Sequence, residues 1–158
     1  DRRFQHIFDA EELKVIGESL PRTRILADES ATFQGKEISI PDFTRRNRTR
    51  LVLKPANSYG GRNVYLGRET DDETWEKLII AQVRSREWIV QEYVPIPRDI
   101  FPVIESDRTI MELKKVNINP FAFGGRYAGS ISRVSDSSVI NVSAGGGLVP
   151  TLPVEETG

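Results

Sequence analysis

The sequence contains no cysteine, one histidine and one methionine in 158 residues. Without cysteine, thiol catalysis, disulfide bonds and thiolate metal sites are excluded. The one histidine, His6, lies near the N-terminus and belongs to no partner pattern. Catalytic triads that need histidine and metal sites that need several histidines are therefore excluded as well.

Neither a strong excess of one charge nor a long apolar run is present. The net charge is −1, from 22 Lys and Arg against 23 Asp and Glu, which gives no general electrostatic basis for binding nucleic acid or a membrane surface. No apolar run approaches the ~18 residues of a spanning helix, and the N-terminus lacks the apolar core of a signal peptide. We expect a cytoplasmic protein without nucleic-acid or membrane partners. Because the chain does not begin with methionine, we also expect a piece of a longer protein.

Two segments have the spacing of amphipathic helices. Residues 9–20 carry Asp9 ahead of periodic apolar positions and are followed by a proline. Residues 71–85 place Trp75 and Ile79 on one face, and Thr70 and Glu73 have the spacing of a capping box. The sequence therefore predicts one helix at each place.

Strands account for most of the rest. The predicted strands are 51–54, 88–94, 108–119, 127–134 and the alternating "SVINVS" at 138–143, with 136–138 as a turn. Pro95, Pro97 and Pro102 predict an irregular connection before residue 108, and the tail from Pro150 is expected to fray. Few helices and many strands in the second half indicate an α+β protein with a mostly antiparallel sheet.

The stretch "LVLKPANSYGGRNVYLG" at 51–67 raises the possibility of a nucleotide site. Lys54 stands at the end of an apolar strand, and a loop with Ser58, Gly60 and Gly61 follows at once. Backbone N–H groups of such a loop can form a nest for phosphate, and the lysine supplies a point charge. The alternative is a hairpin loop in which the glycines only satisfy the turn.

The order of these parts excludes several common nucleotide motifs. No segment fits a Walker A loop or a Rossmann fingerprint, and in kinases the glycine loop precedes the lysine strand. In the strand "WIVQEYV", Gln91 and Glu92 stand among apolar residues. They could read an adenine edge and a ribose, although an ordinary half-exposed strand has the same alternation.

Polar residues of the second half form another cluster. Asn117 and Asn119 share one face of a strand by their period of two and could bind Mg²⁺ or a substrate through oxygen. Paired asparagines before a proline can equally cap a turn. Arg133, in the middle of a predicted strand, is the better arginine for an anion, whereas Arg126 is interpreted as a surface residue. The glycines at 145–147 indicate flexibility or a second phosphate loop.

Taken together, these segments resemble the circularly permuted ATP-grasp group related to glutathionylspermidine synthase. The resemblance covers roughly residues 15–152 and rests on the blocks "LPRTRIL", "LVLKPANSYGGRNVYLG", "WIVQEYV", "NPFAFGGRYAGSISRVS" and "NVSAGGGLVP" in this order. It implies an ATP-grasp fold, with ATP and Mg²⁺ as cofactors. The implied activity is that of a carboxylate–amine ligase acting through an acylphosphate, with acid and amine substrates that include peptide-like ones.

The resemblance also implies roles for individual residues. Lys54 would contact the α and β phosphates, and Ser58, Tyr59, Gly60, Gly61 and Arg62 would close over the β and γ phosphates. Gln91, Glu92, Tyr93 and Val94 would form the adenine hinge. Arg133 would act in catalysis by neutralising the transferred phosphoryl group, and Asn117 and Asn119 would be the metal ligands.

Two departures from the family pattern limit the activity that we expect of this chain. Part of the Mg²⁺-binding and acceptor-binding machinery of permuted members lies upstream, in sequence this chain largely lacks. The position before "NP" is often acidic in the family, whereas this strand offers asparagine.

We expect a lead-in at 1–50, a nucleotide-binding part at 51–95, a β-rich part at 96–152 and a tail at 153–158. We expect this chain alone to be inactive as a ligase. The alternative is a non-catalytic nucleotide-binding or interaction domain with the same fold.

Overall fold

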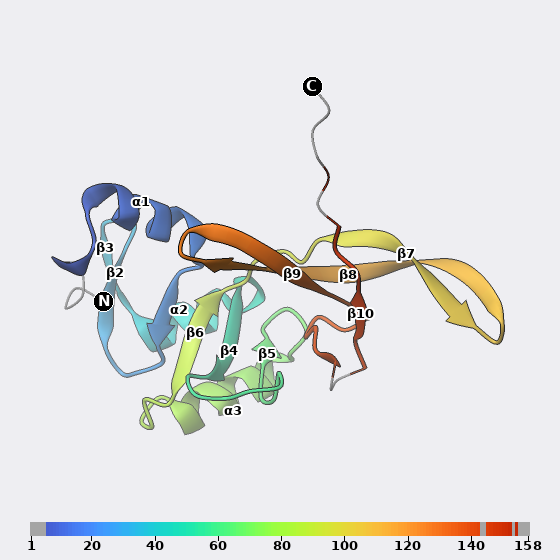
Figure 1. Cartoon of the computed structure of the whole chain (residues 1–158). Coiled ribbons are helices and arrows are strands. Elements are labelled where there is room, and N and C mark those ends of the chain that lie inside the picture. Colours follow the sequence, from blue (N-terminus) through green and yellow to red (C-terminus); the bar gives the residue numbers. More distant parts are fainter. Residues whose placement is uncertain (1–5, 143–144, 153, 155–158) are drawn as a thin grey trace. The chain divides into compact units, whose positions relative to one another are not determined.

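The computed structural model describes residues 6–142, 145–152 and 154 of the chain. These residues divide into two compact units (Figure 1). Unit 1 consists of the described residues up to Asn57 together with Asn63–Val94, and unit 2 consists of Ser58–Arg62 and the described residues from Pro95 onward. The boundary expected at residue 51 does not separate the units, because residues on both sides of it belong to unit 1. None of the described helices is long and apolar enough to cross a membrane.

Unit 1 contains helices and short strands in alternation. Its elements are α1 (Ala10–Ser19), β1 (Thr23–Ile25), β2 (Ser30–Phe33), β3 (Lys36–Ser39), α2 (Ile40–Arg46), a 3₁₀ turn (Arg48–Arg50), β4 (Leu51–Pro55), β5 (Tyr65–Leu66), α3 (Asp72–Gln82) and β6 (Trp88–Glu92). Four strands form an antiparallel sheet in the order β1-β6-β4-β5, and β2 and β3 form a separate hairpin.

The core of unit 1 lies on one face of this sheet. Alternate residues of β4 and β6 point to that face, and Trp75 and Ile79 of α3 are buried with them. The buried cluster comprises Leu26, Ile40, Leu51, Leu53, Trp75, Ile79, Trp88 and Val90. The opposite face of β4 and β6 is only half-buried, as the period of two requires.

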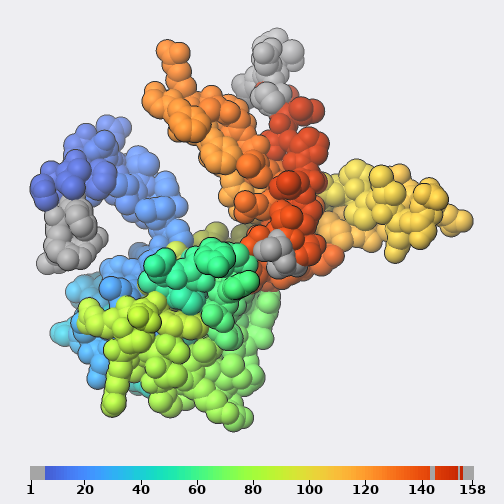
Figure 2. Space-filling view, turned by 60° about the horizontal axis from the view of Figure 1, so that its bottom comes forward, coloured from blue at the N-terminus to red at the C-terminus, as the bar shows by residue number. Residues whose placement is uncertain are grey.

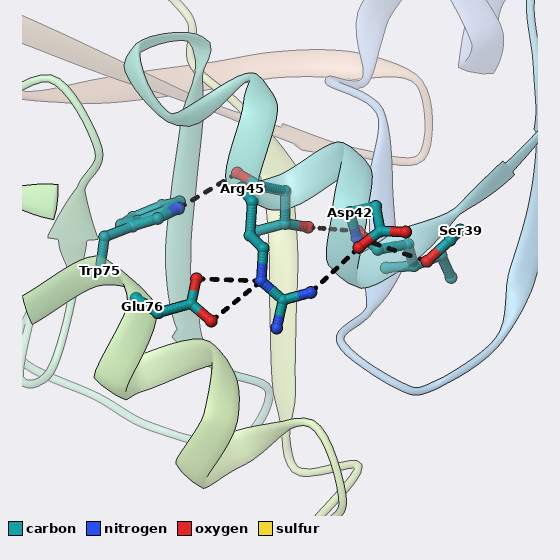
Figure 3. A network of polar contacts seen from close by, with 7 residues as sticks. Ser39, Asp42, Arg45, Trp75 and Glu76 are labelled. Atoms are coloured by element: carbon teal, nitrogen blue, oxygen red, sulfur yellow. Dashed lines mark hydrogen bonds and ion pairs between the residues drawn. The ribbon is translucent and has the colours of Figure 1, made fainter. Parts of the chain in front are cut away.

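A polar network joins α2 to α3 beside this core (Figure 3). The Trp75 indole donates to the Thr44 carbonyl at 3.1 Å, which satisfies two buried groups at once. The Arg45 Nε contacts the Glu76 carboxylate at 2.9 Å, and its Nη1 contacts Asp42 at 3.1 Å. Hydrogen bonds to these two carboxylates, first of all to Glu76, raise the pKa of Arg45, and the Arg45–Glu76 contact joins the two helices.

Both predicted helices of unit 1 are confirmed, with one correction at a cap. α1 begins at a capping box in which Asp9 accepts from the Glu12 N–H and Glu12 accepts from the Asp9 N–H. α3 is capped by Asp71, which accepts from the Thr74 N–H at 2.8 Å. The capping box predicted at Thr70 is wrong, because the Thr70 hydroxyl donates back to the Leu66 carbonyl.

Unit 2 is a four-stranded antiparallel sheet in the order β10-β9-β8-β7. Its strands are β7 (Arg98–Glu105), β8 (Arg108–Phe123), β9 (Arg126–Ser135) and β10 (Gly147–Val149). The first half of the long β8 pairs with β7 and the second half with β9. Figure 2 accordingly shows the yellow β7–β8 hairpin extending beyond the other strands of unit 2.

Two predictions for unit 2 are wrong. The proline-rich segment is not irregular throughout, since β7 pairs along its whole length with β8 and Pro102 lies opposite Met111. β7 is an edge strand, where a missing N–H need not break the ladder. The predicted strand "SVINVS" is not formed over residues 138–142, and its last residue lies outside the described part. Instead β10 provides the neighbour of β9.

The class is therefore α+β with mostly antiparallel sheets and few helices in the described part, as predicted. The predicted strands 88–94, 108–119 and 127–134 correspond to β6, β8 and β9. Of the expected tail, residues 150–152 and 154 are described and belong to no helix or strand. Thr151 nevertheless hydrogen-bonds the Ser132 hydroxyl at 2.5 Å.

Candidate functional site

The predicted site residues fall into two sets, one in each unit. Lys54 and the segment 91–94 belong to unit 1, whereas the loop Ser58–Arg62, Asn117, Asn119 and Arg133 belong to unit 2. Each set has a geometry of its own.

In unit 1, Lys54 heads a chain of polar contacts across three strands. Its Nζ donates to the Gln91 side-chain oxygen at 2.8 Å, and the Gln91 Nε2 donates to the Thr23 hydroxyl at 2.8 Å. The Thr23 hydroxyl in turn donates to the Pro21 carbonyl at 3.0 Å. This relay fixes the orientation of the Gln91 amide, so that its oxygen faces the lysine.

Lys54 lies on the half-buried face of the sheet, opposite the core. It alternates with the buried Leu53, and Gln91 alternates with the buried Val90. Among the described residues, no carboxylate forms an ion pair with Lys54, and its hydrogen-bond partner Gln91 is neutral. An uncompensated ammonium group on a half-buried face is available to attract an anion.

The predicted hinge residues do not share this face. Glu92 follows Gln91 and therefore points to the core side of the sheet. The backbone N–H groups of Glu92 and Tyr93 donate to the Arg22 and Arg50 carbonyls, both at 2.9 Å. The Tyr93 ring is covered by the Arg68 guanidinium at 3.8 Å, and Val94 is exposed. Of this segment, only Gln91 contacts Lys54.

In the glycine loop Ser58–Arg62, the backbone conformation favours the two glycines of its sequence. Gly60 and Gly61 both have positive φ, at 71° and 73°, which favours glycine. A Cβ on Gly61 would lie 2.5 Å from a methyl group of Val139, so glycine is also required by close approach. Tyr59 is exposed, with the Arg62 guanidinium 5.7 Å from its ring. Because β4 and β5 pair antiparallel across the loop, it is also a long hairpin connection.

In unit 2, the structure brings Asn117, Asn119 and Arg133 onto one face of the sheet. Asn117 lies directly opposite Arg133 in the β8–β9 register, and Asn119 is the next residue of β8 on that face. The Asn119 amide donates to the Asn117 side-chain oxygen at 2.6 Å and to the Ile131 carbonyl at 3.1 Å. Both residues lie within β8, so the turn-capping alternative is wrong.

This face carries positive charge. Lys115 precedes Asn117 on the same face, and its Nζ contacts the Ser138 hydroxyl at 2.6 Å. The Nε of Arg133 is buried and has no hydrogen-bond partner among the described residues. A buried donor without an acceptor costs free energy, which a ligand oxygen could recover.

The asparagine pair does not fit a resident Mg²⁺ ion. The Asn117 oxygen already accepts a hydrogen bond, and Lys115 and Arg133 would repel a cation at this face. Within the described ranges, no group of three or more His, Cys, Asp or Glu side chains is placed to hold a metal. The donor set fits an anion better than a divalent cation.

Two contributors were missed by the sequence analysis. Thr23 is 68 positions from Gln91 along the chain, and only the pairing of β1 with β6 brings them together. Lys115 has the same period of two as Asn117 and Asn119, and this spacing could have indicated it. Lys54, Gln91, Asn117, Asn119 and Arg133 lie in the strands expected for them, whereas Tyr93 and Val94 follow the end of β6.

No family model matches this chain, and the search of curated proteins found no match either.

Proposed function

We propose that this chain is the ATP-binding part of an ATP-dependent carboxylate–amine ligase of the permuted ATP-grasp type. The observation that carries the proposal is Lys54, on the half-buried sheet face, held at 2.8 Å by a neutral partner that is itself fixed by Thr23. A lysine paired to a carboxylate would be compensated, whereas this one retains its charge for a polyphosphate.

The second unit supports the same class of ligand. Arg133 has an unsatisfied buried Nε, and Lys115 and the Asn117–Asn119 pair share its face. Phosphoryl transfer asks mainly for such positioned donors and cations, because charge spreads over the oxygens of the transferred group. In the proposal, Lys54 binds the α and β phosphates, and Arg133 compensates charge at the transferred group. Any Mg²⁺ would arrive with the nucleotide.

The proposed chemistry has two steps. A carboxylate oxygen of the acid attacks the γ-phosphorus of ATP, the bond from this phosphorus to the β,γ-bridging oxygen breaks, and ADP leaves. The amine nitrogen then attacks the acyl carbon of the acylphosphate, inorganic phosphate leaves, and the amine loses a proton. In the proposal, the residues of this chain bind and orient the nucleotide for the first step.

Hydroxylamine trapping tests the ligase reaction directly, because hydroxylamine captures an acylphosphate as a hydroxamate. The test uses the natural full-length protein, with ATP and mixtures of amino acids and short peptides as acids. We expect hydroxamate and ADP in equal amounts. Arg133→Met should abolish both, and Arg126→Met, at the exposed start of β9, should not. Equal turnover in both variants would contradict the assignment of Arg133.

The second candidate is a nucleotide-binding domain without ligase activity. It is favoured by the lack of a carboxylate beside Asn117 and Asn119, since no Asp or Glu of β8 or β9 lies on this face in the described structure. It predicts the same ATP binding and the same loss in Lys54→Ala, but no ADP or hydroxamate with any acid. The trapping experiment therefore separates the two candidates.

A further inference from the structure

Unit 1 contains a cavity of about 310 Å³ on the face of the sheet opposite Lys54. It is open to solvent on one side and is lined by residues of β1, of the β2–β3 hairpin, of α2 and of the core side of β4 and β6. Its apolar lining includes Ala31, Phe33, Ile38, Phe43, Leu51 and Val90. The Phe33 and Phe43 rings contact each other with centroids 4.8 Å apart. Small-molecule sites begin at about this volume and have this apolar character.

Most of the charged residues that line this cavity are positively charged. Arg22, Arg24 and Arg50 line it, against the single carboxylate of Glu92. Within the described part of the chain, none of these four side chains takes part in a salt bridge, although seven ion pairs form elsewhere. The Arg24 guanidinium donates to the Thr23 carbonyl at 2.8 Å, and the Arg22 guanidinium lies 5.0 Å from the Phe33 ring centroid.

We propose that this cavity binds a small organic acid with an apolar body, such as an aromatic or short aliphatic carboxylate. The apolar part would lie against Phe33, Phe43 and Val90. The acid group would lie at the mouth, where the arginines exceed the carboxylate and can bind an oxyanion in bidentate fashion. The volume limits the body to about two linked ring systems or a chain of similar bulk.

This site is separate from the proposed nucleotide site. Leu51 and Val90 line the cavity, while Lys54 and Gln91 occupy the other face of the same two strands. The inference does not rest on the proposed function, and the failure of either one leaves the other standing.

The test compares two fluorescent probes with the same aromatic body, anilinonaphthalene sulfonate and the neutral phenylnaphthylamine. We expect one equivalent of the sulfonate to bind, about tenfold or more tighter than the neutral probe. The double variant Arg24→Gln, Arg50→Gln should weaken sulfonate binding about tenfold and leave the neutral probe unchanged. Arg84→Gln, an exposed arginine outside the cavity, is the matched control and should change neither.

A second variant tests the apolar part without altering charge. Ala31→Leu places extra atoms in the cavity and should weaken both probes, with circular dichroism confirming that the fold is kept. Saturating MgATP and Lys54→Ala should leave sulfonate binding unchanged. Equal affinity for the two probes, an unchanged affinity in the double arginine variant, or displacement of the sulfonate by ATP would each overturn the proposal.

Discussion

The Lys54 ammonium group lies 2.8 Å from the side-chain oxygen of Gln91, a neighbour on the next strand that carries no charge. Thr23 holds the other end of the Gln91 amide at 2.8 Å, so the oxygen is presented to the lysine by a fixed side chain. The pair therefore positions a positive charge without cancelling it.

Changing Gln91 to glutamate should cancel that charge. Gln91→Glu keeps the size of the side chain but creates an ion pair with Lys54, and we expect nucleotide affinity to fall about tenfold while the fold is kept. Gln91→Met, which removes the hydrogen bond without adding charge, is the matched comparison. It should lose less nucleotide affinity than Gln91→Glu. Calorimetric titration with MgATP measures both. A glutamate variant that binds as tightly as the unmodified chain would contradict the role of an uncompensated lysine.

The glycine loop offers a test of its local packing. Gly61→Ala should lower the free energy of unfolding by about 2–4 kcal/mol, because it adds a strained φ and a clash with Val139. Gly35→Ala carries a similar φ of +77° but meets nothing within 4 Å, and should cost about 1 kcal/mol. Hydrogen exchange of the β9 amides reports the effect of Gly61→Ala on unit 2.

A double variant isolates the clash from the φ strain. Adding Val139→Ala to Gly61→Ala removes the methyl group that a Cβ would meet at 2.5 Å, and it should recover part of the loss. If the two changes simply add, the close approach of Gly61 to Val139 is not what requires glycine here.

Because Asp71 caps α3 as a carboxylate, we expect the stability of the fold to depend on pH. Hydrogen bonds from Thr74 hold the pKa of Asp71 below its usual 3.8. A lowered pKa in the folded state means that this carboxylate stabilises the fold above pH 3.8, and that its contribution is lost as the pH falls through the folded value.

The matched variant is Asp71→Asn, which keeps a capping oxygen but does not titrate. Near neutral pH, the melting temperature of the unmodified chain should be higher than that of the variant. The difference in melting temperature should shrink in strong acid. A difference that stays constant at every pH would show that ionisation of Asp71 has no part in the cap.

Periodic patterns in the sequence predicted the elements with local signals. The helix at Ala10–Ser19 and the strands β4, β6, β8 and β9 follow from spacing that each segment carries by itself. β7 was missed because Pro102 indicates a break, and only the sheet order reveals that it lies on an edge. "SVINVS" alternates as a strand does, yet β10 is the strand that pairs with β9.

In the candidate site too, local patterns predicted single residues but not the contacts between distant segments. Asn117, Asn119 and Arg133 were predicted one by one, and the register of β8 with β9 places Asn117 and Arg133 opposite each other. Thr23 and the cavity beside Arg24 depend on contacts between distant segments, which no local pattern encodes. Glu92 was grouped with Gln91 although neighbours in a strand point to opposite faces.

Thermal unfolding with and without MgATP, measured on this chain, on Lys54→Ala and on Lys77→Ala, tests whether Lys54 binds the nucleotide. Lys77 is an exposed lysine of α3 paired with Glu73, so its variant controls for loss of charge alone. Ligand at 100 times its Kd stabilises by about 2.7 kcal/mol, which is a shift of several degrees. We expect this shift in the unmodified chain and in Lys77→Ala, and its loss in Lys54→Ala. An equal shift in all three proteins, or no shift in any of them at millimolar MgATP, would show that Lys54 does not hold a nucleotide.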